Sequence, residues 1–227
     1  MNYLALQATY EQLELGIFKD NKCIDAVSHD KKMASTVIIS ALDQLCKKNM
    51  LNLRDFSFIA VNQGPAPFTS LRVVIATANG LSFATGLPLV GVDGLKTFMQ
   101  EYHNPAWPST VALLNAFNQD VYFAYEHKGT VSGYSYKNIE KLLEELKTMY
   151  QHDQQIRFIG NGATLYKKNI DDTFGAKTFF PEPFPAYPSL AAIAQTAYEQ
   201  WLKTKKGASQ LLPLYLKQLH YQQSITD

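Results

Sequence analysis

Cysteine is scarce in this sequence, and so are the features of an exported or membrane protein. Only two cysteines, Cys23 and Cys46, occur among 227 residues, and both stand in apolar surroundings. This favours free thiols in a reducing cytoplasm over a disulfide. No apolar run approaches the roughly 20 residues of a membrane span, and the N-terminus lacks the basic start and small-residue cleavage site of a secretion signal. We therefore expect a cytoplasmic protein with no membrane partner.

An excess of charge of either sign is also absent. Lysine and arginine total 21 and aspartate and glutamate total 20, so net charge gives no argument for a polyanionic partner, although a local basic patch stays open. Hydrophobic residues make up 46% of the chain, which is ordinary for a globular protein and excludes a disordered one. The length suits one large domain or two small ones.

Motifs of catalysis and metal binding are missing as well. The chain has no His-x-Glu-x-x-His, no cysteine pair at metal-ligand spacing and no Gly-x-Ser-x-Gly. His103 and His127 are isolated, and an isolated histidine is more often a surface or hydrogen-bonded residue than a ligand, because ligands come in clusters. We expect no metal and no cofactor.

The first half of the chain alternates between strands and helices. Three short apolar runs joined by tight connections predict an antiparallel meander, and the apolar residues that follow keep helical spacing. The expected elements are strands at Tyr3–Ala8, Leu13–Lys19 and Cys23–Ser28, a helix at Lys31–Asn49, a strand at Phe56–Val61, a helix at Thr69–Gly86, a strand at Leu87–Val92 and a helix at Gly94–Tyr102. This order resembles the ribonuclease H-like half of the actin, sugar kinase and Hsp70 superfamily.

Pro105 and Pro108 mark the best boundary in the chain, because two prolines break any continuing element. Beyond them the pattern repeats in shortened form, with strands at Thr110–Phe117, Val121–His127, Thr130–Tyr136 and Ile156–Ile159, and helices at Asn138–Gln151, Thr164–Phe174 and Ser189–Lys203. We expect an α/β fold of two ribonuclease H-like subdomains, each a mixed sheet flanked by helices, at residues 1–104 and 105–227.

Aromatic residues recur at strand spacing in the second half. They could stack nucleic-acid bases, but the spacing favours core and cross-strand packing. They are Tyr122, Phe123, Tyr125, Tyr134 and Tyr136.

The stretch from Phe56 to Gly86 is the central unit of the sequence. Its pattern predicts a buried strand, a Gly/Pro loop and a helix. Thr69 or Ser70 can cap this helix, and Gly86 stands where a C-terminal stop is expected. Backbone N–H groups of the loop could cradle a phosphate with Arg72 nearby. The alternative, which we favour, is a turn that its prolines merely stiffen, since the pattern matches no known phosphate-loop motif.

The same helix carries a ridge of small residues, Ala76, Gly80 and Ala84, spaced four apart. Such a ridge lets another helix approach closely. It serves either a subunit contact or packing inside this chain, and the two interpretations stand about even. The preceding helix carries Ile39 beside its main apolar stripe, so more than one of its sides is expected to be covered.

Several motifs together resemble the bacterial TsaB (YeaZ) family over nearly the full length. The strongest is the segment from Asn62 to Arg72, NQGPAPFTSLR, where the family has G-x-G-P-G-S-F-T-G-[LV]-R, and the LPLVGV at Leu87–Val92 matches throughout. The chain departs from the family at Gln7, where an aspartate at the superfamily's nucleotide and metal position is usual. A neutral amide cannot supply the charge that helps hold a phosphate-bound Mg²⁺.

The resemblance implies an interaction protein with no catalytic contribution of its own. Such proteins pair with a catalytic TsaD-like subunit, which a TsaE-like ATPase joins, and the complex makes threonylcarbamoyladenosine next to the anticodon of ANN-decoding tRNAs. Contact with tRNA would come only through the complex, and the protein alone would form a homodimer. The alternative is a nucleotide-binding ATPase or phosphotransferase of the same superfamily.

The resemblance also names site residues. The expected partner interface comprises Val37, Ile38, Ala41, Leu45, Val73, Ala76, Thr77, Gly80 and Ala84. The expected vestigial phosphate loop comprises Gln7, Gly64, Thr69 and Arg72.

Overall fold

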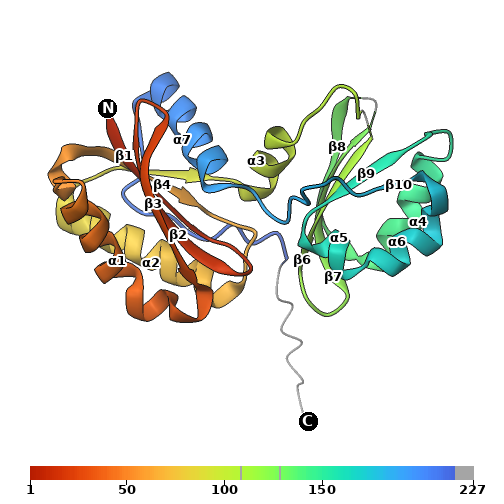
Figure 1. Cartoon of the computed structure of the whole chain (residues 1–227), viewed down its shortest axis with the longest axis horizontal. Helices are drawn as coiled ribbons and strands as arrows, with labels where there is room; N and C mark the ends of the chain where they lie inside the picture. Colours follow the sequence, from red (N-terminus) through yellow and green to blue (C-terminus); the bar gives the residue numbers. More distant parts are fainter. Residues whose placement is uncertain (108, 128, 218–227) are drawn as a thin grey trace, which may run out of the picture.

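Two lobes, each built on a five-stranded sheet, make up the protein (Figure 1). The computed structural model describes residues 1–107, 109–127 and 129–217. Pro108, one of the two prolines of the expected boundary, lies outside the described residues, as does the end of the expected second subdomain. In the described part of the chain, no helix is both long and apolar enough to span a bilayer.

The first sheet has the strand order β3-β2-β1-β4-β5. Its strands are β1 (Asn2–Ala8), β2 (Gln12–Lys19), β3 (Lys22–Asp30), β4 (Phe56–Asn62) and β5 (Leu89–Val92). The first three pair antiparallel as a meander, while β4 pairs parallel to β1 and β5 parallel to β4. A helix crosses from β3 to β4 and another from β4 to β5, as parallel pairing requires.

The second sheet repeats this topology with the order β10-β9-β6-β7-β8. Its strands are β6 (Thr110–Asn115), β7 (Asp120–His127), β8 (Thr130–Asn138), β9 (Ile156–Ile159) and β10 (Thr178–Phe179). Again three antiparallel strands are followed by two parallel ones. The predicted fold class, two ribonuclease H-like units with mixed sheets, is confirmed.

Two parallel crossover helices cover one face of the first sheet (Figure 1): α1 (Ala34–Lys48) and α2 (Phe68–Thr85). A short 3-10 turn at Lys31–Met33 leads into α1. Gly86 ends α2 in the left-handed conformation with φ 76°, as predicted. The predicted cap was wrong, because Pro67 occupies the N-cap without a side-chain bond and Ser70 Oγ instead donates back to the Pro67 carbonyl.

The corresponding face of the second sheet carries α4 (Ile139–Met149), α5 (Asn161–Leu165) and α6 (Lys167–Phe174). The single helix predicted at 164–174 is therefore two helices that meet at Tyr166. The aromatic residues of this lobe pack as predicted, with Phe123 buried and its ring 5.9 Å from that of Tyr125. Both cysteines are free thiols, as predicted, although Cys23 is exposed.

The remaining two helices are exchanged between the lobes. α3 (Gly94–Glu101) belongs to the first half of the chain but buries Leu95 and Phe98 against the second sheet. α7 (Leu190–Thr204) belongs to the second half but buries Ile193 and Ala197 against the first sheet, on the side opposite α1 and α2 (Figure 1). Ser189 caps α7 as predicted, accepting a bond from the Ala192 amide.

This exchange bears on the expected division at residue 104, which stays a prediction. The expected second subdomain contains α7, whereas the packing places α7 on the first lobe. Each sheet thus depends on the other half of the chain for one of its two covering layers.

Candidate functional site

Gln7, the residue at the family's aspartate position, is fully buried at the centre of a hydrogen-bond network. Its Nε2 donates to Glu14 Oε2 and to the Pro188 carbonyl, 3.1 Å away, and its Oε1 accepts a bond from Asn62 Nδ2 at 3.0 Å. The amide therefore joins β1, β2 and β4 to the segment that leads into α7. Its donors and its acceptor are occupied by the protein itself.

The loop after β4 continues the network. Asn62 Oδ1 accepts a bond from the Gly64 amide at 2.8 Å, and the Gly64 carbonyl accepts one from the Gly94 amide at 2.8 Å. Gly64 has φ 108°, which explains a glycine here. The loop's polar groups thus brace the base of α3 as well as the start of α2.

Burial shifts the titration of the carboxylate in this network. It raises the pKa of Glu14 above its ordinary value, and the hydrogen bond from Gln7 partly offsets that rise. A carboxyl with a raised pKa in the folded state lowers the free energy of unfolding as pH rises through that pKa. The amide of Gln7 limits this penalty because it donates to the charged form.

We predict that Gln7→Glu will destabilise the protein by about 3–5 kcal/mol at pH 7, because it removes two buried bonds and brings two carboxylates into contact. Two such groups raise each other's pKa, so the loss should shrink as pH falls through the raised values. The matched control is the exchange Gln7→Glu with Glu14→Gln, which restores one amide and one carboxylate. Urea unfolding at pH 7 and pH 4.5 checks this, and an equal loss in the single and double variants would contradict it.

Among the described residues, a tyrosine side chain joins the two lobes. Tyr10, in the β1–β2 turn, is buried and its hydroxyl donates to the Asn115 carbonyl of the second lobe at 2.7 Å. Burial raises the pKa of Tyr10 well above its ordinary value, so this hydroxyl stays a donor. Leu216, near the C-terminus, packs in the same cluster.

Residues 207–217, here called the C-terminal strap, cross from one lobe to the other. Ala208 pairs with Leu89 on β5 through two 2.8 Å backbone bonds, and the Leu214 amide donates to the Gln63 carbonyl at 2.8 Å. At the far end, Lys217 forms a 2.7 Å ion pair with Asp120 of the second lobe. The strap therefore lies against the loop that follows β4.

Arg72 and Thr69, the other two members of the expected phosphate loop, lie apart from Gln7. The Arg72 guanidinium stacks 3.7 Å above the Phe68 ring, and its Nε donates to the Tyr215 hydroxyl of the strap at 3.0 Å. Thr69 is exposed in the first turn of α2. The structure thus brings Gln7 and Gly64 into one network and directs Arg72 to the surface.

The outer surface of α2 is bare. Ala76, Gly80 and Ala84 are exposed, and a Cβ added at Gly80 would meet no atom within 4 Å. Among the residues that the structure describes, nothing packs on the ridge at Gly80, which favours the subunit contact of the two interpretations left open by the sequence. Phe83, which the sequence pattern did not single out, is 95% exposed on the same helix.

The expected interface residues divide into two groups. Ile38, Ala41 and Leu45 point into the chain's own core and are 3%, 5% and 1% exposed. They therefore do not form part of the exposed surface. Val37, Val73 and Thr77 are half-buried, and Val37 and Val73 also pack against the core of the first lobe. The helical stripe alone cannot tell a core-facing residue from a partner-facing one when both are apolar.

A groove of about 640 Å³ runs beside α1 and reaches α2. Apolar side chains in it include Ile39, which is 58% exposed, together with Leu42, Leu53 and Leu81. The groove, the small ridge and Phe83 together form what we call the α1–α2 surface. Exposed apolar area of this kind, next to a ridge that permits close approach, is typical of a protein–protein contact.

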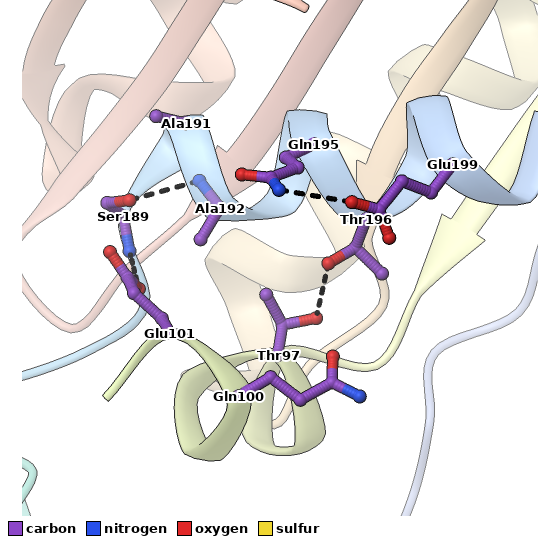
Figure 2. Close-up of a pocket in the computed structure, with 9 residues that line it drawn as sticks. All are labelled: Thr97, Gln100, Glu101, Ser189, Ala191, Ala192, Gln195, Thr196 and Glu199. Carbon is purple, nitrogen blue, oxygen red and sulfur yellow. Dashed lines mark hydrogen bonds between the residues drawn. The ribbon is translucent and has the colours of Figure 1, made fainter. Parts of the chain in front are cut away.

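A second, polar cavity of about 530 Å³ separates α3 from α7 (Figure 2). Glu101 of α3 accepts a 3.0 Å bond from the Ser189 amide, and Thr97 Oγ1 lies 3.4 Å from Thr196 Oγ1 of α7. These contacts tie the exchanged helices to each other, so the cavity marks the joint between the lobes. Among the described residues, no group of three or more histidine, cysteine, aspartate or glutamate side chains could hold a metal ion.

Comparisons with known proteins agree with this architecture. A family model described as TsaD: tRNA N6-adenosine threonylcarbamoyltransferase matches residues 30–222. The chain is 22% identical to the tRNA threonylcarbamoyladenosine biosynthesis protein TsaB of Buchnera aphidicola, covering 95% of this chain and 97% of that protein. It is also 22% identical to TsaB of Bacillus subtilis, covering 96% and 94%.

A solved structure has the same fold. YeaZ from Pseudomonas aeruginosa superposes with a TM-score of 0.71 at 19% identity, covering 95% of this chain and 99% of that one. The family model covers well over half of the chain, and the relatives are matched along nearly their whole length. The chain therefore belongs to the family that this model describes and, within it, to the TsaB (YeaZ) group.

Proposed function

We propose that this protein is a non-catalytic subunit of a complex that makes threonylcarbamoyladenosine next to the anticodon of ANN-decoding tRNAs. It pairs with a TsaD-like catalytic subunit, and a TsaE-like ATPase joins the pair in the cytoplasm. Its relatives carry the name of this biosynthesis. The observation that carries the proposal is the bare α1–α2 surface, with its unfilled ridge at Gly80.

The state of the interlobe space also supports an accessory role. The amide of Gln7 is hydrogen-bonded to Glu14, to the Pro188 carbonyl and to Asn62, and the Tyr10 hydroxyl donates to the Asn115 carbonyl of the second lobe. An ATPase or phosphotransferase would need these groups to face a nucleotide and its Mg²⁺. Isothermal titration with ATP and Mg²⁺ tests that alternative, and tight Mg²⁺-dependent binding by the isolated chain would favour it.

Size-exclusion chromatography with light scattering tests the main proposal. The chain is run alone and mixed with the TsaD-like protein of the same organism. Alone, we expect a homodimer held through the α1–α2 surface. With the partner, we expect a complex of defined mass in which the homodimer is replaced, because both contacts use one surface. The proposal would be overturned if the chain forms no complex with the partner when both are present at tens of micromolar.

A further inference from the structure

A cavity of about 420 Å³ opens where the first turns of α1 and α2 meet the second lobe. We call it the aromatic–cationic cavity. Its walls include Phe68 from α2, Phe117 from the β6–β7 turn, and Lys31 and Lys32 from the turn before α1. It lies at the opposite end of α2 from Phe83 and Ala84, so it is separate from the part of the α1–α2 surface that they form.

Its aromatic side chains are exposed. Phe68 is 47% and Phe117 53% exposed, and they come from different lobes. Tyr215 of the C-terminal strap stands beside Phe68, with the ring centroids 6.1 Å apart. Phe117 is the first of three successive turn residues with positive φ. These backbone angles determine the path of the turn. Exposed apolar side chains that gather in one place, unlike single scattered ones, mark interaction or ligand sites.

The charged side chains that line the cavity have one sign. Lys31 and Lys32 contribute to the walls, no carboxylate does, and neither lysine takes part in an ion pair among the described residues. Arg72 adds a third cation, whose guanidinium stacks on Phe68 and donates to the neutral Tyr215 hydroxyl. The nearly neutral chain thus concentrates positive charge beside two exposed rings.

We propose that the aromatic–cationic cavity binds an unpaired nucleotide of RNA, with the base on Phe68 or Phe117 and the adjoining phosphates at Lys31, Lys32 and Arg72. Aromatic faces beside a cationic edge are the combination that binds single strands, because every base has a face to stack. A small anion alone would leave the rings uncovered. The inference rests on the proposed function, in which the complex's substrate is a tRNA, and it gives this subunit a direct contact with that RNA.

Fluorescence anisotropy with a labelled ten-residue oligouridylate tests the proposal on the full chain. Phe68→Ala and Phe117→Ala should each weaken binding by about 5-fold to 150-fold. Phe83→Ala is the matched control, because it removes a more exposed ring from the same helix outside the cavity, and it should leave binding unchanged. An RNA duplex of the same length should bind more weakly than the single strand.

Salt dependence tests the cations. Replacing Lys31 and Lys32 together by alanine should reduce the slope of log affinity against log salt by about 1.4. The control pair is Lys47 and Lys48 at the other end of α1, which form ion pairs with Asp43 and Asp25. Three outcomes would each overturn the proposal. The first is an equal reduction of the salt slope in the two lysine pairs, and the second is an equal loss of RNA affinity for Phe83→Ala and Phe68→Ala. The third is equal affinity for AMP and for the oligonucleotide.

The experiment separates this proposal from the proposed function. Phe68→Ala and Phe117→Ala should leave pairing with the TsaD-like subunit intact, as measured by light scattering. If the unmodified chain binds RNA but does not pair with the TsaD-like subunit, the result counts against the proposed function alone. Pairing retained with no RNA binding by the isolated chain would count against the cavity alone.

Discussion

Ile193→Asp is expected to unfold the first lobe, although residue 193 follows that lobe's last strand by about 100 positions. Ile193 is fully buried where α7 meets the first sheet, and its neighbours there include Phe58, Val90 and Val92. An aspartate at this position places an unpaired charge in an apolar layer. The expected loss exceeds about 4 kcal/mol, a large part of the stability of a protein this size.

The matched control for this prediction is Gln200→Asp. Gln200 is exposed on the same helix, so this change keeps the helix and the added charge but leaves the sheet covered. Urea unfolding followed by circular dichroism should show a large fall in midpoint for Ile193→Asp and a change within about 0.5 kcal/mol for the control. The packing also implies that a fragment ending at residue 104 will not fold, because it lacks α7. A cooperative unfolding transition in that fragment would contradict both expectations.

Gly80→Leu should separate folding from assembly. The space around Gly80 is empty in the isolated chain, so leucine meets no obstacle, and removing a glycine from a helix interior should raise the free energy of unfolding by about 0.5–1 kcal/mol. In the complex, the added side chain would hold a partner helix away from the ridge. We expect pairing with the TsaD-like subunit to weaken by about 5-fold to 150-fold, from an overpacking cost of about 1–3 kcal/mol.

Gln200→Leu controls for the added apolar side chain, because it places a leucine on an exposed position of α7, away from the α1–α2 surface. Its pairing should match that of the unmodified protein. Light scattering and isothermal titration measure the pairing, while circular dichroism follows the fold. If Gly80→Leu lowers the thermal midpoint and the control does not, the ridge packs differently from the structure and the partner surface must be sought elsewhere.

The fold could be predicted from the sequence because it follows from local patterns. Strand alternation, the helical stripes of α1 and α2, and the stop at Gly86 are set by residues close together in the chain. The exchange of α3 and α7 could not be predicted in this way. Both helices are amphipathic, and periodicity shows that a helix has a buried face without showing which sheet covers it.

Local sequence patterns also predicted part of the candidate site. The bare ridge follows from small residues four apart, but the inward direction of Ile38, Ala41 and Leu45 depends on the angle at which α1 lies on the sheet. Gln7 was identified by its difference from the family pattern. Its bond to the Pro188 carbonyl spans 181 positions and could not be read from the sequence.

The exchange of α3 and α7 constrains when the first lobe can fold during translation. The first sheet is complete once β5 has emerged, yet its second covering layer is not translated until residue 204. At about 5–20 residues per second, the roughly 100 intervening residues take about 5–20 seconds to make. During that interval the nascent chain presents an uncovered apolar sheet face, which a chaperone must shield or the ribosome must hold back. The first lobe is therefore expected to reach its native state only after α7 has been made.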